Sequence, residues 1–331
     1  MIAGNMTADA SALDLSALRE AVARAPDNAK LHYDLSDALA AAGDHGESAA
    51  MFRRAYIINP VQRPALSRDE TIPLARRAAQ LRERALSLIA HGVTYASVIG
   101  ALAVADGILG HRDDVAKLYD YGRFVRCDAI PAPEGFAARD FHATLASESM
   151  RDLEYYDASK KVAFRQGWRN LAIASYDGAA FKAFHSQIRA QVDAYIARLP
   201  RDADNPFLAA RPDEYVIDSW AVVSNGASHH LPHMHPRAWM TGVYYVERPA
   251  ASRQAGTDRG WLRLAPPRRA PGAAPDWLTR MIEPEPGNLL LMPGYFIHES
   301  LPVDAAERRI CIAFDVRPAE LRTRLAHPGV Y

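Results

Sequence analysis

Histidine gathers at one point of this chain, where four of the seven residues from position 229 to 235 are histidines. Two of them, His233 and His235, stand at i and i+2, and on an extended segment side chains at that spacing point to the same side. Neutral imidazole is the commonest side-chain ligand of divalent transition metals. A third ligand must come from a distant strand, and His298, after the apolar run at 289–297, is the natural candidate. The spacing predicts a metal site with positions left open for substrate and oxygen.

Other side chains compete for a place in this site. We interpret His229 and His230 as loop groups at the surface or as groups that orient the ligands, and either could replace His233. A carboxylate could also complete the ligand set, and the candidates for it are Asp218 and Glu299. The sequence therefore does not decide which side chain is the third metal ligand beside His233 and His298.

The bulk composition narrows the class of protein. The 331 residues are 49% hydrophobic and 24% charged, which is ordinary for a globular protein and enough for two domains. Lys+Arg and Asp+Glu both count 39, so no global field favours nucleic acid or a membrane surface as a partner. The two cysteines, Cys127 and Cys311, predict no disulfide framework and fit a reducing cytoplasm. The N-terminal 20 residues lack the features of a secretory signal, and the apolar run at 95–110 is too broken to span a bilayer.

The first third of the chain has helical spacing and a repeat. Leucine and alanine recur at three- and four-residue intervals from 12 to 125, and Pro26 and Pro60 lie 34 residues apart. The pattern between these prolines resembles one tetratricopeptide unit, at about 29–59, with Phe52 in the groove between its two helices. A degenerate copy is predicted at 102–123, where Asp106 occupies a normally apolar place. A helical cap on the second domain and a peptide-binding groove are both open readings, since a solenoid normally needs about three repeats.

A proline-rich stretch divides the chain. We predict a helical tetratricopeptide-like domain at 1–126, a linker at 127–136 and a second domain at 137–331. We interpret Asp315 and the basic stretch from Arg317 to Arg324 as a solvated chain end. Short β-rich runs follow one another in the second domain, at 216–222, 241–246, 261–264, 288–292 and 309–316. Helices followed by many short strands predict an α+β class, with a sandwich or jelly roll in the β part.

At this point the chain resembles the iron(II)/2-oxoglutarate dioxygenases, over about residues 137–318. The resemblance rests on a set of short motifs in order, within a branch that reads His-x-His-Pro, then Ser/Thr-Gly-Val-Tyr-Tyr, Pro-Gly, an apolar strand with His, and Arg-Ile. They are His233-Met234-His235-Pro236, Thr241-Gly242-Val243-Tyr244-Tyr245, Pro286-Gly287 to His298, and Arg309-Ile310. The resemblance implies a double-stranded β-helix, or jelly roll, that uses iron(II), 2-oxoglutarate and dioxygen. It implies His233, His235 and His298 as the metal ligands, although position 235 is Asp or Glu in the usual triad.

The resemblance also implies residues that bind the co-substrate. The far carboxylate of 2-oxoglutarate needs a buried cation, and Arg suits because its fork is bidentate and permanently charged. Arg309 lies 11 residues after His298, close to where prolyl-hydroxylase-like relatives keep this arginine. Arg308 is the alternative, since adjacent residues of a strand face opposite ways. Tyr245 corresponds to the tyrosine that donates to the same carboxylate, and Thr241 of the motif is a further candidate for cofactor binding.

Three functions follow as hypotheses. The leading one is an iron(II)- and 2-oxoglutarate-dependent dioxygenase that hydroxylates a C–H bond and releases succinate and carbon dioxide. Its substrate would be a small molecule, a peptide or protein, or an amino-acid-like compound, with the tetratricopeptide-like region as a possible route for polypeptides. The second is a cupin-type enzyme with three histidines on its metal and no keto acid. The third is a repeat-containing interaction protein with a silent β domain. The oligomeric state stays open.

Overall fold

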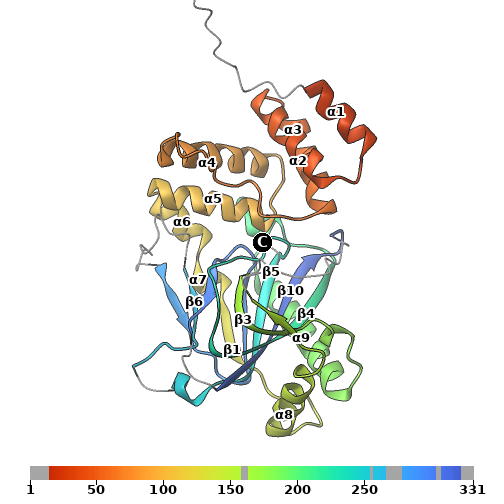
Figure 1. The fold of residues 1–331 in the computed structure, drawn as a ribbon, viewed down its shortest axis with the longest axis vertical. Helices are drawn as coiled ribbons and strands as arrows, with labels where there is room; N and C mark the ends of the chain where they lie inside the picture. The colour runs from red at the N-terminus through yellow and green to blue at the C-terminus, as the bar shows by residue number, and fades with distance from the viewer. Residues whose placement is uncertain (1–14, 158–162, 254–255, 266–277, 303–306, 322–331) are drawn as a thin grey trace, which may run out of the picture.

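The computed structural model describes residues 15–157, 163–253, 256–265, 278–302 and 307–321. A layer of helices formed by the first third of the chain lies against one end of a β part built from the remainder (Figure 1). The helices of this layer are α1 (Leu15–Arg24), α2 (Ala29–Ala41), α3 (His45–Ile58), α4 (Leu74–Ala90), α5 (Ala96–Leu109), α6 (Arg112–Leu118) and α7 (Tyr121–Phe124).

Helices α2 and α3 form the hairpin that the repeat pattern predicts at about 29–59. Asn28 caps α2 by accepting hydrogen bonds from two backbone amides of its first turn, and the Asp44 carboxylate caps α3 in the same way. Between the two helices, Tyr33 and Phe52 meet edge to face with ring centroids 5.2 Å apart. The helix bounds agree with the repeat, and its assignment as a tetratricopeptide unit stays a prediction.

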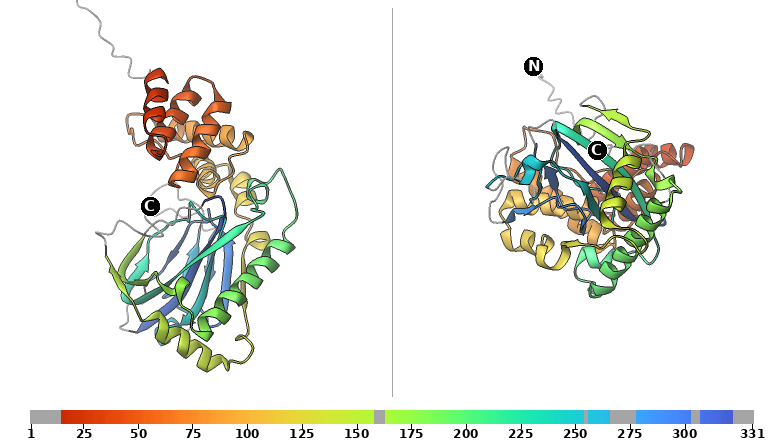
Figure 2. Two further views of the ribbon diagram at one scale, coloured as in Figure 1. Left: turned by 90° about the vertical axis from the view of Figure 1, so that its right-hand side faces the viewer. Right: turned by 90° about the horizontal axis from the view of Figure 1, so that it is seen from below.

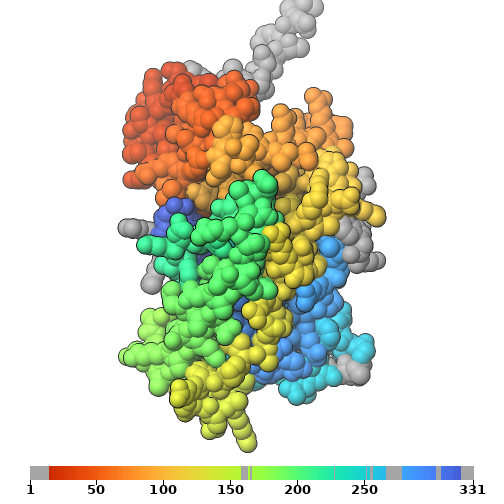
Figure 3. Space-filling model, turned by 180° about the vertical axis from the view of Figure 1, so that it is seen from behind, coloured from red at the N-terminus to blue at the C-terminus, as the bar shows by residue number. Residues whose placement is uncertain are grey.

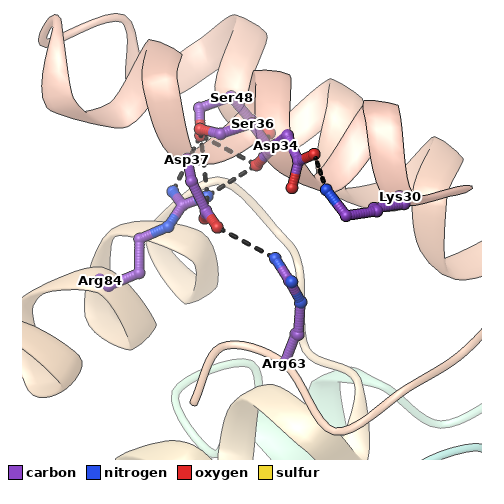
Figure 4. A network of polar contacts seen from close by, with 7 residues as sticks. All are labelled: Lys30, Asp34, Ser36, Asp37, Ser48, Arg63 and Arg84. Atoms are coloured by element: carbon purple, nitrogen blue, oxygen red, sulfur yellow. Dashed lines mark hydrogen bonds and ion pairs between the residues drawn. The ribbon is translucent and has the colours of Figure 1, made fainter. Parts of the chain in front are cut away.

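A polar network joins this hairpin to α4 (Figure 4). Small side chains let α2 and α3 approach, and the hydroxyls of Ser36 and Ser48 each donate to the backbone carbonyl of the other residue, at 2.8 and 2.6 Å. The Arg84 guanidinium of α4 donates to both hydroxyls and lies 3.3 Å from the Asp37 carboxylate. Because both serines are fully buried, these bonds satisfy groups that water cannot reach. They connect α2, α3 and α4 into one layer.

Asp106 on α5 occupies an apolar place of the predicted degenerate repeat, and its surroundings explain why it is tolerated. The carboxylate is 1% exposed, 2.7 Å from Nε of Arg82 on α4 and 2.8 Å from Nδ1 of His111. A buried carboxylate is stable only when it is paired and hydrogen-bonded. The acid at this position therefore joins α4, α5 and the start of α6, instead of packing as the apolar residue of a repeat would.

The β part contains two antiparallel sheets within the described residues. The larger has the order β1-β8-β5-β10-β4-β3-β2, and the smaller has the order β7-β6-β9. The strands are β1 (Arg126–Ala129), β2 (Glu154–Tyr156), β3 (Phe164–Asn170), β4 (Tyr215–His230), β5 (Met240–Glu247), β6 (Leu262–Leu264), β7 (Arg280–Ile282), β8 (Asn288–Pro293), β9 (His298–Ser300) and β10 (Arg308–Pro318). Helices combined with antiparallel sheets confirm the predicted α+β class. The double-stranded β-helix stays a prediction.

Two helices cover one face of the larger sheet (Figure 2). They are α8 (Ala138–Ser149) and α9 (Ala179–Arg198). The apolar residues of α9 recur every three or four positions, and those that face the sheet are buried. Phe184 of α9 meets Tyr244 of β5 with ring centroids 5.2 Å apart. This contact leaves the opposite face of β5 for the interior between the two sheets. The short helix α10 (Pro206–Ala209) follows α9.

The segment predicted as a linker takes part in the sheet. Arg126–Ala129 forms β1, which pairs antiparallel with β8 at the sheet edge, and the Ile130 amide donates to the Gly287 carbonyl. Seen from behind, the part of the chain from about 95 to 150 runs without a break from the helical layer down to α8 (Figure 3). The division of the chain into two domains stays a prediction. Among the described helices, none has the length and apolar composition needed to cross a bilayer.

Candidate metal centre

The structure brings His233, His235 and His298 together. Each ring offers one nitrogen as a ligand atom, and these three nitrogens lie within 4.8 Å of one another. The ring centroids are 4.3, 5.1 and 5.3 Å apart. His233 and His298 face each other across an isolated antiparallel bridge, in which each amide donates to the other carbonyl at 3.0 and 2.9 Å. The i, i+2 spacing and one bridge to a distant strand are enough to assemble the trio.

In all three rings, Nδ1 forms a hydrogen bond with the protein. Each Nδ1 lies at hydrogen-bond distance from an oxygen that can only accept, so the proton sits on Nδ1 and Nε2 keeps its lone pair. The acceptors are the Leu231 carbonyl for His233 at 2.7 Å, the Phe296 carbonyl for His298 at 2.9 Å and the Asp315 carboxylate for His235 at 2.6 Å. A metal bound by these rings would be held through three Nε2 atoms.

The environment also keeps the rings of His233 and His298 uncharged. Burial, together with the neighbouring His235, lowers the pKa of His298 to about 3. Burial and the other histidines hold the pKa of His233 well below its ordinary value. A cationic acid with a lowered pKa loses its proton below neutral pH, so both rings are neutral at pH 7. Neutral imidazole is the form that binds a metal.

The competing side chains have other partners. The His230 ring stacks on Phe164 with centroids 4.5 Å apart, and neither it nor His229 is in the group of three. The Asp218 carboxylate forms an ion pair with Arg317. Glu299 accepts from Arg263 of the neighbouring strand, at 2.6 Å. Neither carboxylate lies in the described histidine group.

Two close backbone contacts position the loop that carries His233 and His235. The His235 amide donates to the Gly294 carbonyl at 2.8 Å, and the Gly294 amide donates to the Trp239 carbonyl at 2.9 Å. A side chain at position 294 would collide with the Ala238 carbonyl, so only glycine allows this contact. On the other side, α5 presents Gly100 directly to Met234, the residue between the two ligands.

The helical layer also supports the segment that leads to His298. The Tyr119 hydroxyl donates to the Tyr295 carbonyl and accepts from the Ile297 amide, both at 3.2 Å. The Tyr119 ring stacks on Phe296 with centroids 4.6 Å apart. Since Tyr119 directly follows α6, the helical layer and the ligand segment form one packed unit.

This contact yields a prediction for Tyr119→Phe. Removing the hydroxyl strands a buried carbonyl and a buried amide, so we expect the free energy of unfolding to fall by about 1–3 kcal/mol. Iron affinity should fall as well, by roughly tenfold or less, because the His298 segment loses its support. Denaturant unfolding and an iron titration measure the two effects. Tyr33→Phe is the matched control, because its hydroxyl donates to Asn59 within the helical layer; an equal loss of iron affinity in both variants would contradict the prediction.

The three histidines line a small cavity of about 50 Å³ that extends between the two sheets. None of the described residues that line it is an aspartate or glutamate. They are Arg169, Trp220, Val222, His230, His233, His235, Thr241, Val243, Tyr245, Gly260, Leu262, His298, Ser300, Arg309, Cys311 and Ala313. Two buried guanidinium groups in a cavity whose lining carries no acid favour an anionic occupant.

The two candidate arginines of β10 face opposite ways. Arg309 is 4% exposed and lines the cavity together with Cys311 and Ala313, as strand alternation predicts. Its guanidinium donates only to neutral oxygens, namely Ser224 Oγ, the Gly260 carbonyl and Ser300 Oγ, at 3.1–3.2 Å. Arg308 lies outside and pairs with Glu247 at 2.7 Å. An anion in the cavity would therefore meet Arg309.

Tyr245 lies beside this arginine, and the register of β5 pairs it with Cys311. Its hydroxyl is buried and has no hydrogen-bond partner in the structure. Burial raises the pKa of this phenol far above its ordinary value, so it is a proton donor at neutral pH. A buried donor without an acceptor is costly, and a carboxylate in the cavity would satisfy it. This orphaned hydroxyl fits the implied co-substrate.

Thr241 lies at the histidine end of the same strand. Its hydroxyl donates to the Phe314 carbonyl at 3.0 Å and lies 3.5 Å from Nδ1 of His235. In the structure Thr241 is therefore a neighbour of a candidate metal ligand, and its role in cofactor binding stays a prediction.

The sequence interpretation of the chain end is wrong for Asp315, Arg317 and Leu321, which are buried. Asp315 is 9% and Arg317 5% exposed, because β10 continues to Pro318 between β4 and β5. Asp315 contacts His235, and Arg317 pairs with Asp218. The end of the predicted basic stretch, at 322–324, lies outside the described residues.

Sequence reasoning also missed Arg169 of β3. This residue is 2% exposed, lines the cavity and places its guanidinium 5.9 Å from the centroid of the Trp220 ring. Its segment follows a region of helical spacing and contains a β-bulge between positions 165 and 167, so no regular alternation was present to indicate a strand.

A second and larger cavity, of about 630 Å³, lies where the helical layer meets the β part. Tyr56 and Tyr95 line it from the helical layer, with ring centroids 3.9 Å apart. Arg237 and Trp239 line it from the loop after His235. None of its described lining residues is a histidine or cysteine, so we assign the metal chemistry to the smaller cavity.

Comparison with known proteins agrees with the site. Residues 218–315 match the model of a family described as "Putative 2OG-Fe(II) oxygenase", and this range contains the three histidines, Tyr245 and Arg309. The match supports a 2OG-Fe(II) oxygenase and leaves the substrate and reaction open. With the three-histidine group, it is consistent with the cofactor set of iron(II), 2-oxoglutarate and dioxygen. A search of curated proteins finds no match.

Three solved structures show a distant likeness. A prolyl-4-hydroxylase from Pseudomonas putida is 18% identical, with a TM-score of 0.40, over 60% of this chain and 95% of that one. A prolyl hydroxylase from Trichoplax adhaerens, in complex with a hypoxia inducible factor peptide fragment, is 15% identical, with a TM-score of 0.41, over 64% and 91%. HygX from Streptomyces hygroscopicus, with nickel, 2-oxoglutarate and hygromycin B bound, is 14% identical, with a TM-score of 0.41, over 61% and 86%.

Proposed function

We propose that the β part is an iron(II)- and 2-oxoglutarate-dependent dioxygenase that hydroxylates a C–H bond of a peptide, protein or amino-acid-like substrate. One observation carries the proposal. A single cavity is lined by three oriented histidines and by a buried arginine and tyrosine that have no carboxylate partner. A metal alone would account for the histidines. Only an anion beside the metal accounts for Arg309 and Tyr245 as well.

Each group has a role that follows from its surroundings. His233, His235 and His298 would hold iron(II) through Nε2. Arg309 and Tyr245 would bind the far carboxylate of 2-oxoglutarate. The strand register supports this role, since it pairs Tyr245 with Cys311, two residues from Arg309. When bound, iron, 2-oxoglutarate and dioxygen supply the oxidation: one oxygen atom enters the C–H bond of the substrate, the other enters succinate, and carbon dioxide leaves. Val243, Leu262 and Ala313 line the cavity and exclude water.

The proposed substrate class rests on the second cavity. A volume of about 630 Å³ is within the range of ligand sites, and its walls combine aromatic rings with arginines from the helical layer and from the loop that follows His235. A polypeptide held there would touch both parts of the chain. Hydroxylation is then tested by supplying peptides and measuring whether 2-oxoglutarate turnover rises above its uncoupled rate.

An anaerobic titration tests the function without a known substrate. Apo-protein is loaded with iron(II) and then with 2-oxoglutarate, and the weak visible charge-transfer band of the chelated keto acid is followed. We expect the band to appear, and to be followed in air by succinate formation equal to 2-oxoglutarate consumption. Iron binding without the band would favour the cupin-type enzyme. Failure to bind iron would leave an interaction protein as the better account.

Tyr245→Phe should separate co-substrate binding from folding. The hydroxyl makes no hydrogen bond in the structure, so the free energy of unfolding of the apo-protein should stay the same or rise. The dissociation constant for 2-oxoglutarate should increase about tenfold or more, because a hydrogen bond to a charged group is worth about 1.5–3 kcal/mol. The charge-transfer titration and denaturant unfolding measure the two quantities. The opposite result would be an apo-protein destabilised by more than about 1 kcal/mol with unchanged affinity for 2-oxoglutarate. It would show that the Tyr245 hydroxyl stabilises the fold and does not bind the co-substrate.

A further inference from the structure

The contact between Asp315 and His235 sets one of the three histidines apart from the others. We propose that Asp315 is a positioning residue that acts through His235 and supplies the negative charge that a three-histidine metal centre lacks. This inference rests on the metal centre of the proposed function. It adds a residue that does not touch the metal and whose charge would tune it.

Strand pairing fixes the position of Asp315. It lies on the central strand β10, opposite Asp218 of β4 and Thr241 of β5. Its Oδ1 accepts from Nδ1 of His235 at 2.6 Å, and both side chains are buried. Trp220 lies nearly parallel to the His235 ring, with centroids 6.0 Å apart. The Asp315 carboxylate and the Trp220 ring therefore both help to hold the His235 ring.

The other two histidines have weaker acceptors. His233 and His298 donate to backbone carbonyls of their own loops, at 2.7 and 2.9 Å. A carboxylate acceptor withdraws the Nδ1 proton more strongly than a carbonyl does, and it raises the basicity of Nε2 on the same ring. His235 would thus be the most electron-rich of the three ligands. It is also the residue at the position where the family resemblance expects a carboxylate.

A charge count shows why the carboxylate is needed. Two neutral histidines and one carboxylate carry a formal charge of −1, whereas three neutral histidines carry none. With Asp315 included, the set returns to −1, and the charge lies one hydrogen bond further from the metal. The buried carboxylate is itself stabilised by the His235 N–H and by the electrostatic attraction of Arg237.

The variant Asp315→Asn isolates this charge. The amide is of similar size, and its oxygen can still accept from Nδ1, so the shape of the site is kept. We expect affinity for Co(II) and for Fe(II), measured anaerobically by competition with a coloured chelator, to fall about 10- to 100-fold. Asp218→Asn is the matched control, since it makes the same chemical change at the paired position of β4 and contacts Arg317 instead of a histidine. The control should keep the metal affinity of the wild type.

A second readout follows the electron density on the metal. Removing the charge should move the iron-to-2-oxoglutarate band of Asp315→Asn to shorter wavelength, an effect that a purely structural role would not produce. Equal metal affinity and an equal band position in Asp315→Asn and wild type would overturn the inference while leaving the proposed function intact. Absence of metal binding in the wild type would instead overturn the proposed function.

A measurement on the wild type covers the case in which Asp315→Asn fails to fold. In Zn(II)-loaded protein with ¹⁵N-labelled histidine, the Nδ1–H proton of one of the three ligand rings should lie clearly downfield of the other two, because its acceptor is charged. Three ring protons with similar shifts would contradict a charged acceptor at His235 and overturn the inference.

Discussion

We expect His298→Ala to abolish iron binding and 2-oxoglutarate turnover together. His298 is the proposed ligand that comes from the smaller sheet, so its loss would leave two imidazoles from one short loop. Iron affinity should drop by more than about 100-fold, which exceeds the cost of losing a residue that only orients a ligand. The bridge to His233 is formed by backbone atoms, so the variant should fold. Anaerobic iron titration and succinate formation measure the two losses.

His230→Ala is the control for this experiment. His230 lines the same cavity and is also a histidine, but it lies outside the group of three and its ring stacks on Phe164. It should keep iron binding within a few-fold of the wild type. A His298→Ala protein that binds iron as tightly as this control would remove His298 from the ligand set, and with it the basis of the proposed function.

We expect Arg309→Ala to retain iron binding and to lose 2-oxoglutarate binding. The guanidinium is the proposed buried cation for the far carboxylate, and removing one partner of a buried ion pair costs about 3–5 kcal/mol. That cost raises the dissociation constant of 2-oxoglutarate by about two to almost four orders of magnitude. The charge-transfer band should then be absent at 2-oxoglutarate concentrations that saturate the wild type. Arg309→Lys should recover only part of the affinity, since an ammonium group cannot form the two-pronged contact.

Arg308→Ala is the matched control at the adjacent position. Arg308 is exposed and pairs with Glu247, and surface ion pairs contribute about 0–1 kcal/mol. Its removal should leave the band and the turnover unchanged. A loss of 2-oxoglutarate in Arg308→Ala but not in Arg309→Ala would reverse the assignment. Activity that is lost in His298→Ala but unchanged in both Arg308→Ala and Arg309→Ala would favour the cupin-type enzyme.

Local patterns predicted the strands that carry the site. The predicted runs at 241–246, 288–292 and 309–316 correspond to β5, β8 and β10 within two residues at each end, because alternation and β-branched residues are properties of the segment itself. The same patterns missed β1, β2, β3, β7 and β9. Four of these strands, all except β3, have only three or four residues, and β1 and β3 pair with β8 and β4, which lie far away in sequence.

The sequence by itself determined the chemistry that is available: the i, i+2 histidines, a third histidine after an apolar strand, and an arginine whose alternation places it on one face. The tertiary structure decided which of these groups meet. It left His230 outside the group of three, turned Arg308 outward, brought Arg169 to the cavity and brought Asp315 to His235. These outcomes depend on contacts between segments far apart in the chain, such as His235 with Asp315. Spacing along one segment specifies which side chains share a face, but only the pairing of strands specifies what that face meets.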